Sequence, residues 1–220
     1  MIKLIIFDLD GTLIDTLEDI ANACNHALQQ CGHPTRALAE YNMLVGRGID
    51  NLFRGALPQG HKTENMVAQM REHFISYYNE HMYDFTKPYE GILDTLKILS
   101  CKGVKFAVAS NKYQQGTEQL VERFFKEYDF VRILGQREGK PIKPDPQIVL
   151  EAMKGIEGIR LEEVLYCGDS DVDMQTGINA GVRTIGVTWG FRTREELESH
   201  SPFAVIDQAS EIIDITQNIL

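Results

Sequence analysis

Short apolar runs alternate with helical patterns along most of this chain. Five runs have the length and apolar content of buried strands, at residues 2–7, 104–109, 131–134, 164–167 and 182–187. Helical patterns lie in the intervals between them, at residues 91–99, 114–125, 146–153 and 173–180. Such an alternation is typical of a parallel sheet with helices on both of its faces. The sequence therefore predicts an α/β fold with a Rossmann-like parallel sheet as its core.

The interval from residue 16 to residue 85 departs from this alternation. It contains no convincing strand, and its two long helical patterns cover residues 17–30 and 64–81. Insertions are tolerated in loops at the carboxyl ends of strands, where ligands also bind in open α/β sheets. We therefore interpret residues 16–85 as an α-helical cap domain inserted after the first strand. Residues 1–15 and 86–220 would then form the α/β catalytic core.

The charge of the chain limits its partners. The 220 residues include 22 basic and 32 acidic side chains, which gives a formal net charge of −10. Nucleic acids and anionic membranes bind concentrated basic faces, so we expect neither as a partner. The apolar run before Asp8 is too short for a signal peptide or a membrane span. The four cysteines form no Cys-x-x-Cys pair and are expected to be reduced and buried, which predicts a cytoplasmic protein.

The strongest chemical signal is the segment 8–12, Asp-Leu-Asp-Gly-Thr, directly after the first predicted strand. Residues two apart in an extended chain project to the same side, so Asp8 and Asp10 converge on one point. Two crowded carboxylates are costly unless a cation or a proton relieves their repulsion. Gly11 permits the sharp turn that leaves the strand.

A second acidic cluster, residues 168–173, follows the fourth predicted strand and contains Asp169, Asp171 and Asp173. We expect one of these acids to cap the helix that follows. Its neighbours would supply oxygen ligands to Mg²⁺, which binds one or two carboxylates together with water and a substrate phosphate.

Two further strand ends carry groups that suit phosphate binding. Ser110 and Asn111 follow the second predicted strand, at an expected helix start where backbone N–H groups also bind anions. Lys143 opens a Lys-Pro-Asp-Pro run whose prolines stiffen the backbone, and Lys140 is the alternative lysine. All four motifs lie just beyond strands, so a parallel sheet would gather them around one crevice. This set of groups suits phosphoryl transfer to a carboxylate nucleophile.

The four motifs, in this order and with a helical insertion after the first, resemble the haloacid dehalogenase superfamily of phosphohydrolases over essentially the whole chain. The resemblance implies that Asp8 is the nucleophile that becomes an aspartyl phosphate and that Asp10 is the acid/base. It implies phosphate binding by Gly11, Thr12, Ser110, Asn111 and Lys143. It implies Mg²⁺ held by Asp8, the backbone carbonyl of Asp10, and Asp169, with Ser170 and Asp173 ordering the acidic loop.

Two features narrow the expected reaction within the superfamily. Dehalogenases lack the second aspartate, so Asp10 favours phosphoryl chemistry. The Val-Gly-Arg-Gly turn at residues 45–48 resembles a cap turn of the phosphoglycolate phosphatase group, and segment 186–191 also resembles that group. Arg47 is the candidate for contacting a substrate carboxylate, with a solvated arginine as the alternative. The sequence predicts a Mg²⁺-dependent phosphatase acting on a small, phosphoglycolate-like phosphomonoester.

Other activities stay open at this point. The main alternative is a β-phosphoglucomutase-like isomerase, but such mutases carry a histidine where this chain has Ile20 and often a valine where it has Thr12. Pyrophosphatases and nucleotide or sugar-phosphate phosphatases share the same motifs. A catalytically idle binding protein is disfavoured, because its acidic residues would be expected to decay. The sequence does not indicate an oligomeric state.

Overall fold

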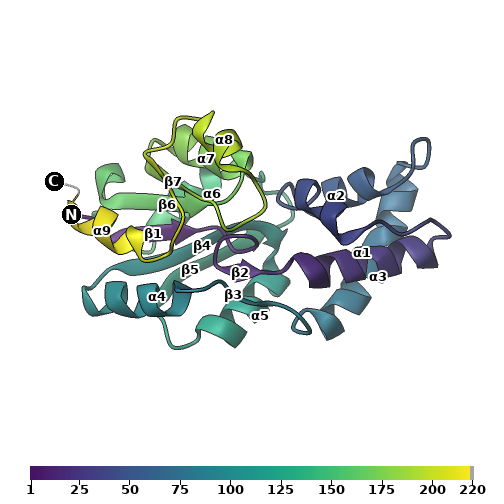
Figure 1. Cartoon of the computed structure of the whole chain (residues 1–220), viewed down its shortest axis with the longest axis horizontal. Coiled ribbons are helices and arrows are strands. Elements are labelled where there is room, and N and C mark those ends of the chain that lie inside the picture. Colours follow the sequence, from purple (N-terminus) through teal and green to yellow (C-terminus); the bar gives the residue numbers. More distant parts are fainter. Residues whose placement is uncertain (219–220) are drawn as a thin grey trace.

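The computed structural model describes residues 1–218 and has a six-stranded parallel sheet at its centre (Figure 1). The strands are β1 (Leu4–Phe7), β4 (Lys105–Tyr113), β5 (Phe130–Gln136), β6 (Val164–Gly168), β7 (Arg183–Val187) and β8 (Ala204–Ile206). Their order across the sheet is β5-β4-β1-β6-β7-β8, and every pair is parallel. The central strands β1 and β6 are buried along their whole length, which explains their unbroken apolar sequences.

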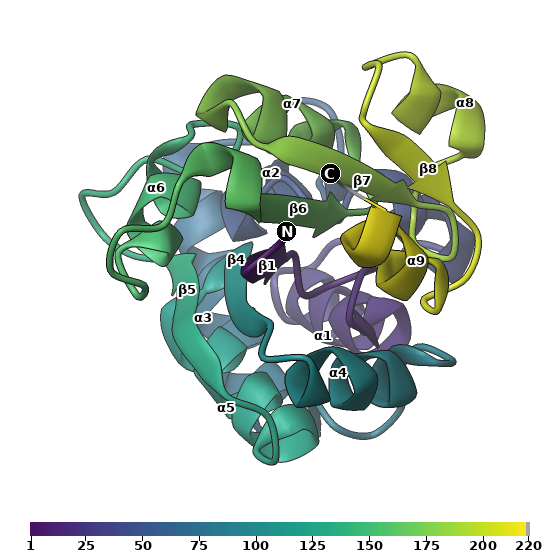
Figure 2. The same ribbon diagram turned by 90° about the vertical axis from the view of Figure 1, so that its left-hand side faces the viewer.

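Helices cover both faces of the sheet (Figure 2). They are α4 (Ile92–Cys101), α5 (Gln114–Phe125), α6 (Gln147–Met153), α7 (Asp171–Ala180), α8 (Arg194–Glu198) and α9 (Glu211–Asn218), with a short 3₁₀ helix η2 (Leu161–Glu163) before β6. Alternate residues of β1 point to opposite faces. Ile5 and Phe7 pack with residues of α4, α5 and α9, whereas Leu4 and Ile6 pack with residues of α6 and with Ala180 of α7.

A separate group of helices, which we call the helical lobe (residues 17–81), lies at one end of the molecule (Figure 1). It contains α1 (Leu17–Gln30), the 3₁₀ helix η1 (Leu38–Met43), α2 (Ile49–Ala56) and α3 (Glu64–His81). Within its core, the ring of Phe74 meets Phe53 edge to face at a centroid distance of 5.4 Å and stacks on Tyr78 at 5.2 Å. Two short antiparallel strands, β2 (Ile14–Asp15) and β3 (Lys87–Pro88), connect the lobe to the rest of the chain.

The structure confirms the predicted α/β fold and corrects several details. Helices α1, α3 and α5 begin and end at the predicted residues. The second predicted strand is longer than expected: β4 continues to Tyr113, so Ser110 and Asn111 lie inside the strand and not at a helix start. The sequence reading missed α2, α8, α9 and β8. Cys101 is exposed, whereas a buried thiol was expected. Across residues 1–218, every helix is too short or too polar to cross a membrane.

Candidate active site

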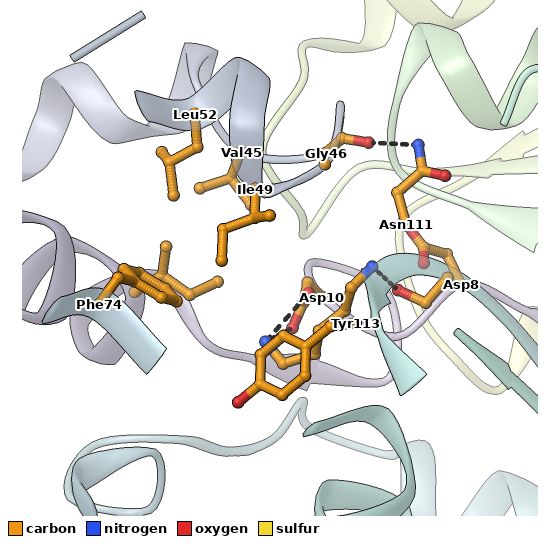
Figure 3. Close-up of a pocket in the computed structure, with 13 residues that line it drawn as sticks. Asp8, Asp10, Val45, Gly46, Ile49, Leu52, Phe74, Asn111 and Tyr113 are labelled. Atoms are coloured by element: carbon orange, nitrogen blue, oxygen red, sulfur yellow. Dashed lines mark hydrogen bonds and ion pairs between the residues drawn. The ribbon is translucent and has the colours of Figure 1, made fainter. Parts of the chain in front are cut away.

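The carboxyl ends of β1 and β4 meet the helical lobe at a small cavity of about 50 Å³ (Figure 3). The core side of this cavity carries its polar groups: Asp8, Asp10, Ser110, Asn111 and Lys112, followed by Tyr113. The lobe side consists of apolar side chains and glycine backbone: Ile20, Val45, Gly46, Gly48, Ile49, Leu52 and Phe74. A ligand that enters would therefore place its charged end on the sheet and its remaining atoms against the lobe.

Asp8 and Lys143 form a buried ion pair at the core of this site. The Nζ atom of Lys143 lies 3.0 Å from Oδ1 of Asp8 and 2.7 Å from Oδ1 of Asp173. Burial raises the pKa of Asp8 to about 7; Lys143 opposes this shift, while Asp173 and Asp10 add to it. Burial alone would lower the pKa of Lys143, but Asp173 and Asp8 raise it above its usual value. The ammonium is therefore a fixed positive charge beside Asp8.

Three buried carboxylates lie close enough together to hold a cation. Oxygen atoms of Asp8, Asp169 and Asp173 lie within 4.8 Å of one another. Burial raises the pKa of Asp169 well above its usual range, and the carboxylates of Asp173 and Asp8 raise it further. The Lys143 ammonium pairs with two of these carboxylates, those of Asp8 and Asp173. The excess negative charge and the all-oxygen donor set fit a hard divalent cation.

The acidic loop is organised by Ser170 and Asp173 at the start of α7. Ser170 caps the helix, with its Oγ accepting from the Asp173 N–H at 3.3 Å, so the expectation that an acid would cap this helix is wrong. The carboxylate of Asp173 accepts from the N–H and the hydroxyl of Ser170 and from the hydroxyl of Tyr166. Together with Lys143, these donors engage both oxygens of Asp173. Asp173 is thus held in a single orientation.

Two glycines allow the backbone to close around Asp169. Gly11 has a φ of +85°, and a Cβ there would overlap the Asp169 carboxylate. A Cβ on Gly190 would overlap both Asp169 and the carbonyl oxygen of Gly11. Thr12 donates its hydroxyl to Asp169 Oδ1 at 3.2 Å, and the N–H of Phe191 donates to Oδ2 at 2.8 Å. Gly190 was not identified from the sequence, because its close contact with the first motif arises only in the folded chain.

Asp10 is held from two sides. Its Oδ1 accepts from the Thr16 hydroxyl at 2.9 Å and from Lys112 Nζ at 3.1 Å. The same ammonium donates to the hydroxyl of Tyr78 on α3 at 2.8 Å. Sequence reasoning assigned no role to Lys112. Its position two residues after Ser110 in a strand was the available signal, since such residues share a face.

The remaining predicted residues divide into those at the cavity and those outside it. Asn111 accepts from the Lys143 N–H at 2.9 Å and donates to the Gly46 carbonyl at 3.1 Å, so it joins the core to the lobe (Figure 3). Ser110 is buried and its hydroxyl accepts from the N–H of Lys112. Lys140 is exposed and does not line the cavity, whereas Lys143 is buried and contacts Asp8.

Arg47 is not brought into the cavity. Its side chain is 54% exposed and pairs with Asp171 at 2.5 Å. Arg192, which sequence reasoning did not identify, is buried and donates to the backbone carbonyls of Asn42 and Val45. The two arginines together fasten one turn of the helical lobe to the core.

Fold and site together define a protein of the doubly wound α/β class with a cluster of buried carboxylates at the carboxyl edge of its sheet. The haloacid dehalogenase-like hydrolase family model matches residues 5–187, and the chain belongs to this family. The phosphoglycolate phosphatase of Haemophilus influenzae is 32% identical over 219 residues, which cover 97% of each chain. That of Vibrio parahaemolyticus is 31% identical, over 97% of this chain and 96% of its own.

Solved structures agree with these sequence relatives. The crystal structure of a predicted phosphoglycolate phosphatase from Haemophilus somnus has a TM-score of 0.89 and 29% identity, covering 98% of each chain. Family membership and the named relatives place this protein among the phosphoric monoester hydrolases.

Proposed function

We propose that this protein is a Mg²⁺-dependent phosphatase that hydrolyses a small phosphomonoester through an aspartyl phosphate on Asp8. The observation that carries the proposal is the buried carboxylate of Asp8, 3.0 Å from the Lys143 ammonium, at a cavity that also contains Asp10. A nucleophile, a fixed cation and a second carboxylate are the groups that phosphoryl transfer to a carboxylate requires.

In the first half of the reaction, an oxygen of Asp8 attacks phosphorus and the bond from phosphorus to the leaving oxygen breaks. Asp10 donates its proton to that oxygen, so that an alcohol departs. In the second half, Asp10 takes a proton from water, whose oxygen attacks the phosphorus of the aspartyl phosphate. Inorganic phosphate leaves and the carboxylate of Asp8 is restored.

We assign phosphate binding to Gly11, Thr12, Ser110, Asn111 and Lys143. Lys143 balances negative charge on Asp8 and on the phosphoryl oxygens, because its ammonium is buried beside the nucleophile. The side chains of Thr12 and Asn111 are already engaged with Asp169 and Lys143, and the Thr12 N–H donates to the carbonyl of Leu9 at 3.3 Å, so phosphate binding by these two residues would require an exchange of partners. The Ser110 hydroxyl lines the cavity and supplies a further donor.

The metal ligands in this proposal are Asp8, Asp169 and the backbone carbonyl of Asp10. Asp173 is excluded as a ligand because Lys143, Tyr166 and Ser170 engage both of its oxygens; with Ser170 it orders the acidic loop. What Mg²⁺ supplies when bound is neutralisation of the phosphoryl and nucleophile charge.

The helical lobe is proposed to act as a cap, with residues 16–85 forming the cap domain and residues 1–15 and 86–220 the catalytic core. The short paired strands β2 and β3 lie at the two crossings between these parts, where a hinge would have to bend. The cytoplasm is the proposed compartment, in keeping with four free thiols.

Phosphoglycolate is the proposed substrate type. Two observations support it: the names of the relatives and the small size of the cavity. A mutase is disfavoured because Ile20, at the position of the mutase histidine, contributes an apolar wall to the cavity. The predicted contact between Arg47 and a substrate carboxylate would require Arg47 to leave Asp171.

The test is phosphate release from four compounds, with Mg²⁺ and then with EDTA. The compounds are phosphoglycolate, β-glucose 1-phosphate, pyrophosphate and a nucleoside monophosphate. We expect Mg²⁺-dependent release that is fastest with phosphoglycolate. If phosphate is released fastest from another compound, the assignment of a phosphoglycolate-like substrate is wrong. If EDTA leaves the rate of phosphate release unchanged, the proposed metal dependence is wrong.

A further inference from the structure

Lys112 is a buried charge that the proposed reaction leaves without a role. It lies on β4 two residues after Ser110, and its side chain is only 5% exposed. Its ammonium contacts both carboxylate oxygens of Asp10, at 3.1 and 3.3 Å. A buried ammonium is costly unless it is paired and hydrogen-bonded, so this position is unfavourable for lysine without Asp10.

The third partner of Lys112 comes from the helical lobe. The Tyr78 hydroxyl on α3 accepts from the ammonium at 2.8 Å, and the ammonium lies 4.5 Å from the centre of the Tyr78 ring. Tyr78 is fully buried, and burial with nearby Asp10 raises the pKa of its hydroxyl well above its usual value. Its ring stacks on Phe74, which lines the cavity. One cation therefore connects the lobe, the sheet and Asp10.

We infer that Lys112 is a positioning residue for Asp10, and that Tyr78 makes this positioning depend on the helical lobe being seated on the core. The inference rests on the proposed function, in which Asp10 is the acid. Lys112 holds the Asp10 carboxyl from one side while Thr16 holds Oδ1 from the other. When α3 moves away, Lys112 loses both the hydroxyl and the ring that fix its ammonium. Proton donation to the leaving group is thereby linked to closure over the substrate.

This role has a kinetic signature that a purely structural role lacks. Ethyl phosphate and acetyl phosphate have similar size and charge, but ethoxide needs a proton in order to leave and acetate does not. The quantity to measure is kcat/KM for both compounds and for phosphoglycolate, because kcat/KM reports on the step in which the leaving group departs. General acid catalysis contributes about 10²–10⁴-fold, so its loss is readily measured.

The two diagnostic variants are Lys112→Met and Tyr78→Phe. We expect Lys112→Met to lower kcat/KM about 100-fold for ethyl phosphate and phosphoglycolate, and less than about 5-fold for acetyl phosphate. Tyr78→Phe keeps the ring and removes only the hydroxyl. We therefore expect kcat/KM to fall about 10-fold for ethyl phosphate and phosphoglycolate, and again much less for acetyl phosphate. Because its packing is unchanged, Tyr78→Phe tests the inference even if Lys112→Met fails to fold.

Matched controls separate this effect from general damage. Lys105→Met removes an exposed lysine from the same strand, where its ammonium pairs with Asp129 at 2.6 Å. Tyr77→Phe removes a hydroxyl from the neighbouring position of α3, on a ring stacked between His26 and His81. In both control variants, the ratio of kcat/KM for ethyl phosphate to kcat/KM for acetyl phosphate is expected to equal that of the unmodified protein.

Four outcomes overturn the inference. Equal losses with all three compounds would show a structural role, and a loss confined to phosphoglycolate would show that Lys112 recognises the substrate carboxylate. If the unmodified protein cleaves acetyl phosphate but neither alkyl ester, Asp10 is not acting as an acid. Inactivity of the unmodified protein with all compounds would overturn the proposed function itself, and this inference with it.

Discussion

The ammonium of Lys143 lies 3.0 Å from the carboxylate of Asp8, and both side chains are almost completely removed from solvent. The Lys143-Pro144-Asp145-Pro146 segment and the end of β1 are far apart in the sequence, yet the fold brings them into contact. In the proposed reaction, Asp8 is the nucleophile, and the Lys143 ammonium balances its charge before any substrate binds. The expected behaviour of the enzyme follows from this arrangement.

Replacement of Lys143 by methionine should reduce both activity and stability. Without the ammonium, Asp8 and Asp173 would be buried without their shared cation, which typically costs about 3–5 kcal/mol in the free energy of unfolding. We expect kcat/KM to fall by about 10²–10³-fold. Urea unfolding and phosphate release measure the two effects. Lys140→Met, an exposed lysine three residues earlier, is the control, and an equal loss in that variant would contradict the assignment.

Mg²⁺ should stabilise the folded protein through Asp169. A cation that binds only the folded state at about 100 times its dissociation constant adds about 2.7 kcal/mol to the free energy of unfolding. We expect Mg²⁺ to raise the melting temperature and Asp169→Asn to remove most of that increase. Asp145→Asn changes an exposed carboxylate and should keep the full increase. An undiminished increase in Asp169→Asn would exclude Asp169 as a ligand.

The stability of the metal-free protein should depend on the protonation of Asp8. Its pKa rises from 3.8 to about 7 in the folded state, chiefly through burial. The folded state therefore binds more protons than the unfolded state between these values, and the stabilisation present below pH 4 is lost as the pH rises toward 7. We expect the unfolding free energy of Asp8→Asn, relative to the unmodified protein, to increase over this range. The measurement is urea unfolding of both proteins in the presence of EDTA. A difference in unfolding free energy that does not change with pH would contradict the raised pKa of Asp8.

Arg47 should contribute to closure of the lobe more than to recognition of a carboxylate. Its ion pair with Asp171 is partly exposed, and such pairs are typically worth up to about 1 kcal/mol. We expect Arg47→Gln to raise KM by up to about 5-fold, equally for phosphoglycolate and ethyl phosphate. A larger increase limited to phosphoglycolate would instead support the contact with a substrate carboxylate expected from the sequence.

The sequence predicted those parts of the fold that local patterns determine. The run 4–7 is apolar at every position because β1 is buried on both faces, and the helical spacing of α1 reflects one buried stripe. The short outer strand β8 is only partly buried and has too few residues for a recognisable pattern. Gly135 lies in β5, where a Cβ would overlap the carbonyl of Lys112, a contact that only the folded chain reveals.

The sequence predicted those site residues that directly follow, or lie near the end of, a recognisable strand. Asp8, Asp10 and Ser110 meet at one cavity because parallel strands end at the same edge of the sheet. The contacts that Lys112 and Arg192 make with the helical lobe were not predictable, since their partners there are a tyrosine hydroxyl and backbone carbonyls. No spacing in the sequence encodes how the lobe sits on the sheet.

The most direct test of the central claim is to identify the residue that carries the phosphoryl group during turnover. The reaction with phosphoglycolate and Mg²⁺ is quenched rapidly and treated with borohydride, which reduces an aspartyl phosphate to homoserine. Peptide mass mapping then locates the modified residue. We predict homoserine at position 8, only when substrate is present and not in Asp8→Asn. Turnover without modification of Asp8, or modification of a different residue, would contradict the account.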